Sequence, residues 1–480
     1  MARRGRIFVA LVLLAVVLVV LVLLGFLPQD FLRRFVEKRL QSGLGAGSSI
    51  GRMHTVPGRL STDVEDLVIQ GPTYRLTVPK ARVVLEPGFL FGKALSFLSV
   101  VLESPRLEIT PATTGDSAAL NQSLVIRQLT VTNATIVYHL GPQNQLSLTG
   151  VSLRGAVGEG ALDVAAKGGT WQRDTTVAFG PVTGRLRVSS RLDIGIDSLE
   201  SDVLHSHVQV SGPLGRIGAL NPDLRLQARI DLRDLSAFGL GADVSGRITA
   251  QGKLSGLGES MTLDTKIQGS TLKISSWPID RIDAHLVHKG GLDGRTDVTL
   301  EADLLGGRTD GMVRLRGNQT DADLKFSGID VARLRAQGVA LAWPQSGRLG
   351  GTLSASGNWR STLQVKGTVE TAGLAAGDMA LRARLDASGG VRLQARAVDL
   401  TFDLKLDGER PAAGSLPRLR SADFVVRGQA RGAFPPPIDA TIAGSLGVET
   451  EGGAETVPVT GRARYAGGAY SASLEARGLG

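Results

Sequence analysis

The sequence predicts a mainly β protein that begins with a transmembrane helix and a short amphipathic helix and continues as a long antiparallel β-sheet. Three observations support this prediction. The 480 residues include 62 glycines and only 4% aromatic residues, which is more typical of an extended repetitive sheet than of compact domains. Apolar and polar residues alternate through most of the chain, and one uncharged apolar stretch lies near its start.

The apolar stretch covers residues 7–27 and is dominated by Leu and Val. Its 21 residues, at a rise of about 1.5 Å each, reach across a hydrocarbon core of about 30 Å. Arg3, Arg4 and Arg6 precede it, so the positive-inside rule predicts a cytoplasmic N-terminus and places the rest of the chain on the far side. A cleaved signal peptide is the alternative. No A-x-A-like site follows the stretch, so we expect an uncleaved anchor.

Residues 29–42 (QDFLRRFVEKRLQS) predict a short amphipathic helix. Its apolar residues recur at helical spacing, with charged residues on the other face; they are Phe31, Leu32, Phe35, Val36 and Leu40. We expect this helix either to lie on lipid headgroups or to plug the end of the following sheet. The glycine-rich residues 43–51 end it.

From about residue 50 onward the hydrophobic period is two, as in strands that are buried on one side only. Clusters of Gly, Asn, Asp and Ser separate the runs, as hairpin turns require, and roughly 27 strands fit in the body. The apolar positions of the clearest runs are Leu224, Leu226, Ala228, Ile230, Leu232, Val298, Leu300, Ala302, Leu304, Leu324, Phe326, Leu363, Val365, Leu381, Leu385, Leu404 and Leu406.

These apolar positions need a cover, and apart from the two N-terminal helices only residues 330–337 suggest another helix. The sheet is therefore expected to cover itself, by closing into a barrel, by pairing as sandwiches or by curling into a trough. An aliphatic trough would suit acyl chains, because each CH₂ group that leaves water contributes about 0.8 kcal/mol. The residues named above are our candidates for its lining.

Composition and motifs argue against several other functions. The net charge is +9, but the basic residues are scattered and have no interleaved aromatic residues, so we expect no nucleic-acid binding. With no Cys, disulfides and thiolate metal sites are excluded. His205 and His207 would share one face of a strand, yet two ligands do not make a metal site, and solvated histidines are the simpler interpretation. No P-loop, G-x-S-x-G or H-E-x-x-H motif occurs, so we expect neither an enzyme nor a cofactor.

The order of parts near the N-terminus resembles the AsmA-like superfamily of bacterial envelope proteins, which includes AsmA and TamB. The anchor and amphipathic helix are followed by IGR at residues 50–52, GRL at 58–60, VEDLVIQ at 64–70, ARVVL at 81–85, FLFGKAL at 89–95, VVLESPRLEI at 100–109 and LVIRQLTVTNATIVY at 124–138. The likeness is specific over roughly the first 140 residues. Beyond them it extends only to the style of alternating strands.

The resemblance implies a chorein-like start and a sheet curled into a U-shaped groove, a β-taco. It divides the chain into an anchor at residues 1–27, a helix and linker at 28–49, a chorein-like region at 50–140 and a β-groove at 141–480. The implied function is binding of phospholipid acyl chains for transport between the inner and outer membranes and for outer-membrane biogenesis. The implied location is the bacterial inner membrane, single-pass, with the bulk of the chain in the periplasm.

TamB-like members imply a second partner, an outer-membrane barrel protein, and a role in outer-membrane protein assembly. Those members are far longer and have a recognisable C-terminal domain, whereas this sequence ends after a strand-like stretch at residues 461–480, as a shorter member or a fragment would. Two alternatives to lipid transport remain. One is an envelope scaffold whose apolar faces pair in dry sandwiches. The other is an outer-membrane barrel, which the anchor and the missing aromatic girdles disfavour.

Overall fold

The computed structural model describes most of the chain after residue 46, together with seven helical residues before it. The described residues are 30, 33–34, 36–38, 41, 47–56, 61–71, 74–86, 95–110, 123–141, 144–158, 160–172, 176–216, 219–238, 243–275, 277–291, 294–337, 346–376, 379–393, 395–410, 418–433, 436–450, 453–466 and 469–476. The predicted transmembrane helix, with Arg3, Arg4 and Arg6, lies outside them. Within these ranges no helix has the length and apolar character needed to span a membrane.

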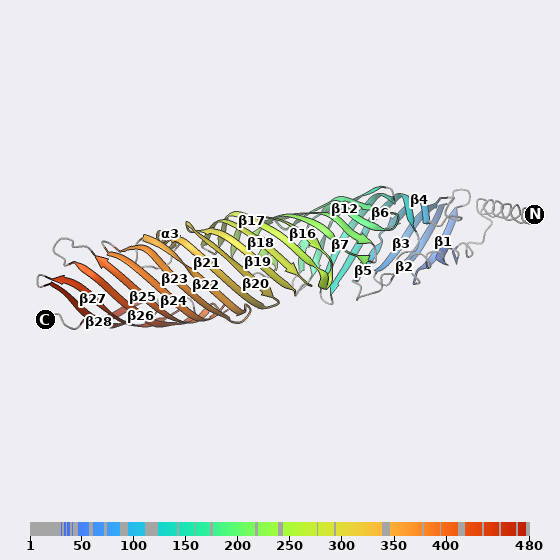
Figure 1. Ribbon diagram of the computed structural model, residues 1–480. Coiled ribbons are helices and arrows are strands. Elements are labelled where there is room, and N and C mark those ends of the chain that lie inside the picture. The colour runs from blue at the N-terminus through green and yellow to red at the C-terminus, as the bar shows by residue number, and fades with distance from the viewer. Residues whose placement is uncertain are drawn as a thin grey trace, which may run out of the picture. The chain divides into compact units, whose positions relative to one another are not determined.

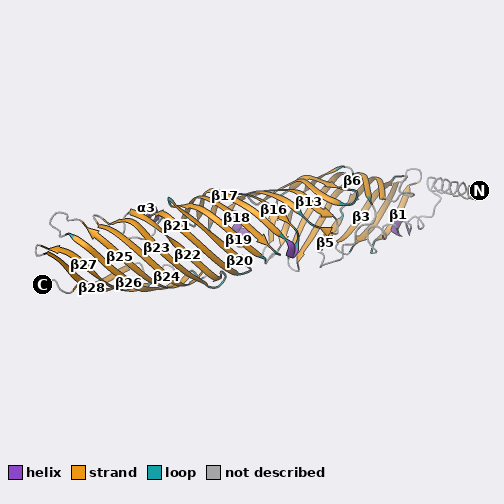
Figure 2. Ribbon diagram, viewed as in Figure 1, coloured by secondary structure: helices purple, strands orange, loops and turns teal. Residues whose placement is uncertain are grey.

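The described chain is mainly β, which confirms the mainly β, largely antiparallel part of the predicted fold class. Its 29 strands make up a large and mainly antiparallel sheet with few helices (Figure 2). The chain divides into two compact units. Unit 1 comprises Met1–Gly241 with Gln251–Leu257, and unit 2 comprises Ala242–Ala250 with Gly258–Gly480. The finer division of the sequence at residues 49 and 140 stays a prediction.

Unit 1 holds the first fifteen strands and one 3-10 helix. They are β1 (Ser49–Val56), β2 (Ser61–Gln70), β3 (Tyr74–Leu85), β4 (Leu95–Glu103), β5 (Arg106–Ile109), β6 (Leu124–Gly141), β7 (Asn144–Val157), β8 (Ala161–Ala166), β9 (Gly168–Gln172), β10 (Thr176–Phe179), β11 (Val182–Val188), β12 (Asp193–Val203), β13 (Ser206–Arg216), β14 (Ala219–Leu220), β15 (Asp223–Asp231) and η2 (Leu232–Phe238).

Two pairings in unit 1 depart from the antiparallel expectation. β4 and β5 both pair with β3 in antiparallel fashion and with β6 in parallel. They are two parts of one bent strand, interrupted where Ser104 takes a positive φ of 52° before Pro105, whose nitrogen has no hydrogen to donate. β6 therefore runs in the same direction as β4 and β5. A period of two assigns the faces of a strand but not its direction.

The described residues of the predicted amphipathic helix are helical and cover the first strands of unit 1. Val36 packs against a buried cluster that contains Ile50 and Val78. Arg33 Nη1 donates to the carbonyl of Gly51 at 3.1 Å, and Gln41 Nε2 donates to the carbonyl of Ser48 at 2.9 Å. The helix therefore caps the start of the sheet, as in the plugging arrangement.

Unit 2 is a succession of antiparallel neighbours in chain order, which lie side by side in Figure 1. After η3 (Gly258–Ser260) its elements are β17 (Thr262–Ile274), β18 (Trp277–Lys289), β19 (Arg295–Leu304), β20 (Gly307–Arg316), β21 (Gln319–Asp330), α3 (Val331–Ala336), β22 (Ser346–Asn358), β23 (Leu363–Ala376), β24 (Met379–Arg392), β25 (Ala397–Arg410), β26 (Leu419–Ala433), β27 (Ile438–Thr450), β28 (Gly453–Ala466) and β29 (Ala469–Ala476). The remaining strand, β16 (Val244–Ser255), has residues in both units.

Tight turns connect several of these strands, as the sequence pattern predicts. Leu305 and Gly306 join β19 to β20 with φ values of 52° and 77°. Two successive positive φ values are the mark of a type I′ turn, whose twist matches that of the flanking strands. The helix suggested at residues 330–337 is also present as α3, and the carboxylate of Asp330 caps it by accepting from the backbone N–H of Ala332 at 2.8 Å.

One predicted strand ends earlier than its alternation indicates. β15 stops at Asp231, and Leu232 begins η2 instead of continuing the strand. The Asp231 carboxylate accepts from both the backbone N–H and the guanidinium of Arg233, which turns the chain at this point. Leu232 is buried, with 8% exposure, but it is a helix residue, so its expected place on a strand face is wrong.

Candidate functional site

The strand register of unit 2 places apolar residues opposite one another in rows that cross thirteen strands. The central row consists of Ile267, Ala284, Leu300, Gly311, Leu324, Leu353, Gly367, Ala387, Phe402, Gly428, Ala440, Ala463 and Ala472. Each residue stands directly opposite the next one on the neighbouring strand. Because side chains two residues apart share a face, the rows on either side of this one lie on the same surface.

The two flanking rows have the same character. One consists of Gly269, Ile282, Ala302, Thr309, Phe326, Gly351, Val369, Leu385, Leu404, Val426, Ile442, Gly461 and Leu474. The other consists of Thr265, Leu286, Val298, Val313, Ala322, Ala355, Val365, Gly389, Leu400, Ala430, Ile438 and Tyr465. These three rows are called the apolar face below.

The structure brings together the predicted lining residues of unit 2 on this surface. Eight of them belong to the three rows, namely Val298, Leu300, Ala302, Leu324, Phe326, Val365, Leu385 and Leu404. Four others extend the same surface toward the strand ends, namely Leu304, Leu363, Leu381 and Leu406. In unit 1, Leu224, Leu226, Ala228 and Ile230 share one face of β15.

The sequence prediction missed several members of the rows. Val369, Val426 and Ile442 stand in the same row as Leu404, yet none of them was expected to line the surface. Their own strands do alternate, but glycines on the apolar side shorten each recognisable run. A search that accepted Gly as an apolar-face residue would have found them.

Within the described residues of unit 2, the apolar face is partly accessible to water. Most of its large side chains are half-buried, whereas Leu353 and Leu474 are exposed at 38% and 61%; Leu381, which extends the surface beyond the three rows, is buried at 5% exposure. The polar residues of the same strands are mostly exposed, as in β21 and β25. Within the described part of unit 2, α3 packs near the ends of β21 and β22, and its Val331 clusters with Leu374 of β23 and Leu381 of β24. The polar face of these strands is therefore the more exposed of the two.

Large side chains on this face lean over glycines of the neighbouring strand. A Cβ atom added to Gly428 would stand 2.6 Å from Cζ of Phe402, and one added to Gly311 would stand 2.6 Å from Cδ2 of Leu324. The same relation joins Gly351 to Phe326, at 2.9 Å. Because these side chains lie along the sheet, they form a low apolar floor over the glycines.

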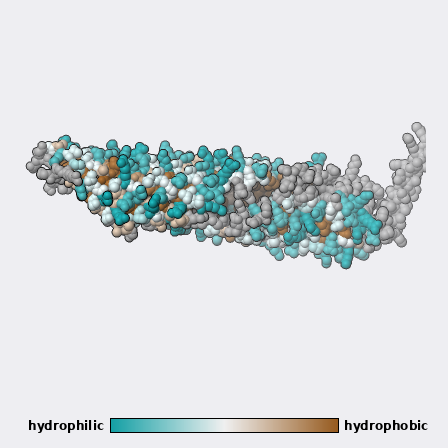
Figure 3. All heavy atoms as spheres, turned by 90° about the horizontal axis from the view of Figure 1, so that it is seen from below, coloured by the Kyte–Doolittle hydropathy of each residue, from teal (hydrophilic) through white to brown (hydrophobic). Residues whose placement is uncertain are grey.

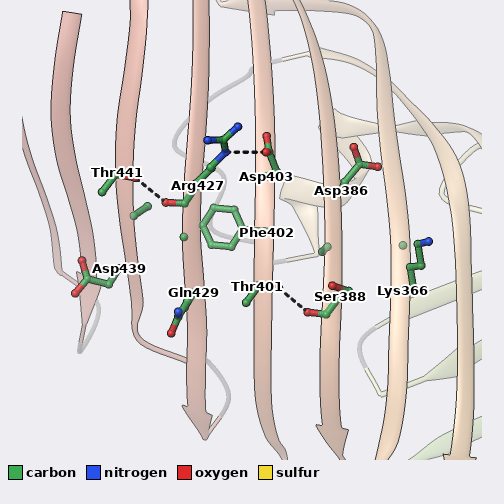
Figure 4. Close-up of a pocket in the computed structure, with 14 residues that line it drawn as sticks. Lys366, Asp386, Ser388, Thr401, Phe402, Asp403, Arg427, Gln429, Asp439 and Thr441 are labelled. Atoms are coloured by element: carbon green, nitrogen blue, oxygen red, sulfur yellow. Dashed lines mark hydrogen bonds and ion pairs between the residues drawn. The ribbon is translucent and has the colours of Figure 1, made fainter.

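The opposite face is polar and is connected by ion pairs and hydrogen bonds between strands. Arg427 Nε donates to the Asp403 carboxylate at 3.0 Å, and the Thr441 hydroxyl donates to the Arg427 carbonyl at 3.3 Å (Figure 4). A shallow open pocket of about 730 Å³ lies here, bordered by Thr401, Asp403 and Gln429 among others. In the view of Figure 3, hydrophilic residues dominate the described surface, with smaller hydrophobic areas between them.

His205 and His207 make polar contacts with different residues. His205 lies in the turn after β12, so it does not share a strand face with His207, contrary to the expectation. His205 Nδ1 lies 2.8 Å from Oδ1 of Asp234, and Ser206 Oγ donates to Oδ2 of the same carboxylate at 2.6 Å. Burial alone would raise the pKa of Asp234, but the hydrogen bonds from Ser206 and His205 outweigh burial and lower that pKa. Among described residues, no group of three or more His, Asp and Glu side chains is placed to hold a metal ion.

Comparison with known proteins adds no relative, since no family model, curated protein or solved structure matches this chain.

Proposed function

We propose that the apolar face of unit 2 binds lipid acyl chains. The observation that carries this proposal is the continuity of three rows, two across thirteen strands and one across twelve, whose large side chains are mostly still accessible to water. A surface of this kind, left uncovered in water, is unfavourable by about 25 cal/mol for each Å² of apolar area. Acyl chains remove that cost without any specific polar contact.

We further propose that the protein is an inner-membrane-anchored periplasmic member of the AsmA-like superfamily that transports phospholipid between the two membranes. Support comes from residues 7–27 with the preceding arginines, and from the order of motifs up to residue 138. The low floor of Leu and Phe side chains over glycines supports the same proposal, because a lipid acyl chain that slides along this floor meets few protruding side chains.

The test is a lipid crosslink from one face of one strand. A photoreactive phenylalanine derivative replaces Leu404, on the apolar face of β25, or Lys405, the next residue, which is exposed on the opposite face. We expect irradiated cells to yield a phospholipid adduct of the protein with the probe at position 404 and none with the probe at position 405. Mass spectrometry of the purified protein identifies the adduct.

Equal adducts at both positions, or none at 404, would contradict the proposal. In the second case the envelope scaffold becomes the better description, because its apolar surface would be covered by protein.

A further inference from the structure

Alternate turns of unit 2 share an edge of the sheet, and one of these two edges is rich in arginine. Consecutive turns of an antiparallel succession alternate between the two edges of the sheet. The turns between β20 and β21, between β22 and β23, and between β24 and β25 therefore lie on the same edge. Arg316, Arg360, Arg392 and Arg396 lie within or beside these turns, and all four are exposed. They are called the arginine edge below.

The first two of these turns are in direct contact. The backbone N–H of Trp359 donates to the carbonyl of Asn318 at 3.1 Å, which joins the turn after β22 to the turn after β20. The Arg360 guanidinium lies over the Trp359 ring, 5.1 Å from its centroid. The third turn follows two strands further, about 10 Å along the edge.

No carboxylate among the described residues pairs with the arginine edge. The described residues of the three turns contain no Asp or Glu, and no ion pair among the described residues involves any of the four arginines. Other arginines near the strand ends do form ion pairs, at this edge, as Arg431 with Asp399 at 2.9 Å, and at the opposite edge, as Arg420 with Glu449 at 2.6 Å. The positive charge of the arginine edge therefore lacks a partner within the described chain.

Apolar residues reach this edge from the apolar face. Leu363, Val391 and Val398 stand opposite one another on β23, β24 and β25, one or two residues from the turns. Leu393 lies in the third turn and is 51% exposed, between Arg392 and Arg396. The half-buried Trp359 adds an amphipathic ring of the kind that is enriched where apolar and aqueous regions meet.

We infer that the arginine edge is a subsite for the phosphate group of a phospholipid whose acyl chains lie on the apolar face, an inference that rests on the proposed function. A guanidinium presents a planar pair of N–H donors that matches two phosphate oxygens, and a phosphate supplies the missing negative charge. The subsite orients the lipid, with its headgroup at this edge and its acyl chains across the rows. It also selects lipids that carry a phosphate over those that do not.

The experiment compares two labelled lipids with the same acyl chains, phosphatidylglycerol and diacylglycerol, on the full-length protein. We expect the wild-type protein to bind phosphatidylglycerol about tenfold more tightly, since charge-assisted hydrogen bonds contribute at this level. The triple variant Arg360→Gln, Arg392→Gln, Arg396→Gln should bind both lipids equally, with unchanged affinity for diacylglycerol. The dissociation constants are measured by fluorescence anisotropy in detergent micelles.

The matched control removes the same charge from the opposite edge, as Arg335→Gln, Arg348→Gln, Arg382→Gln. These three arginines are also exposed, and we expect the control to keep the preference for phosphatidylglycerol. A loss of preference in the control, or its persistence in the arginine-edge variant, would overturn the subsite.

Two further outcomes separate the two proposals. If the wild-type protein binds neither lipid, the proposed function fails; if it binds both equally, only the subsite fails. Inorganic phosphate alone should bind weakly, because it has no acyl chain to add apolar contact. Tight binding of free phosphate at this edge would contradict a lipid headgroup as the ligand.

Discussion

At the scale of single residues, the pairing of glycine with a large apolar neighbour shapes the apolar surface. Gly408 stands opposite Leu381, and a Cβ atom at Gly408 would lie 2.5 Å from Cδ2 of Leu381. Leu381 is only 5% exposed, so its methyl group has little room to move. The glycine is therefore required by the side chain that crosses it.

We expect Gly408→Ala to lower the free energy of unfolding by about 1 kcal/mol, because the new methyl group overpacks the site. Combining it with Leu381→Ala should cost less than the sum of the two single changes, since the truncated side chain makes room. Urea titration followed by circular dichroism measures the three variants. Gly195→Ala, where a Cβ atom would meet nothing within 4 Å, is the control and should be close to neutral. Additive effects at Gly408 and Leu381 would refute the packing argument.

Residue identity predicted the faces of the strands but not the rows that they form. Leu300 and Leu404 were assigned to an apolar face because their neighbours in sequence are polar. That alternation survives a slip of two residues between strands, so it leaves open which residues stand opposite each other. The arginine edge was missed for the same reason. The sequence does contain the information needed to find this edge, however. Arg360 and Arg396 fall in alternate turns of an antiparallel succession, and such turns lie on the same edge of the sheet.

At the scale of elements, η2 shows how a few polar contacts redirect a strand. The Asp234 side chain is 4% exposed and binds the turn after β12 through the backbone N–H of His205, at 3.0 Å, and the hydroxyl of Ser206. A hydrophobic pattern does not register such contacts, which is why η2 was not predicted and Leu232 was placed in a strand. In contrast, a helix was expected at residues 330–337, and the structure shows Asp330 as the N-cap of α3.

We expect Asp234→Asn to destabilise the protein at neutral pH. The pKa of Asp234 in the folded state lies below its ordinary value of 3.8, so the stability from its ionised form is fully present above that value. This contribution is lost as the pH falls through the folded-state pKa. The difference in melting temperature between wild type and variant should therefore shrink below about pH 4.

Asp202→Asn is the control for this prediction, because Asp202 also contacts a histidine, His207, at 2.8 Å, but its side chain is 71% exposed. Its effect should be small at every pH. If Asp234→Asn lowered the melting temperature by the same amount at every pH, the shape of this side chain, and not its charge, would explain its role.

At the scale of the whole molecule, each strand of unit 2 from β17 onward pairs with its neighbours in the chain. A hairpin of two strands is thus a removable unit, whereas a single strand is not, because the next strand would run in the wrong direction. The sequence anticipated roughly this number of strands from length and turn spacing. The sequence could not predict whether the apolar face is accessible to water, because apolar and polar residues alternate in the same way in a trough and in a sandwich.

We expect deletion of residues 379–418, which removes β24 and β25, to leave a protein that unfolds cooperatively. The turn after β23 then leads into β26 in the original direction, and Gly367 and Gly428 of the central row become neighbours. The urea m value should fall in proportion to the surface removed. Deletion of residues 379–396, which removes β24 alone, is the control and should abolish cooperative unfolding. The reverse order of the two results would contradict the proposed independence of hairpins.

The nearest-neighbour pairing of unit 2 also bears on how the polypeptide reaches its native state. Every strand from β18 onward finds its first partner immediately upstream, so no segment has to wait for a distant one. Folding of this kind has a low contact order, because strands are added one after another from the earlier ones to the later ones. The N-terminal strands can therefore fold while the rest of the chain is still being synthesised. At each stage only the last strand added has an unpaired edge.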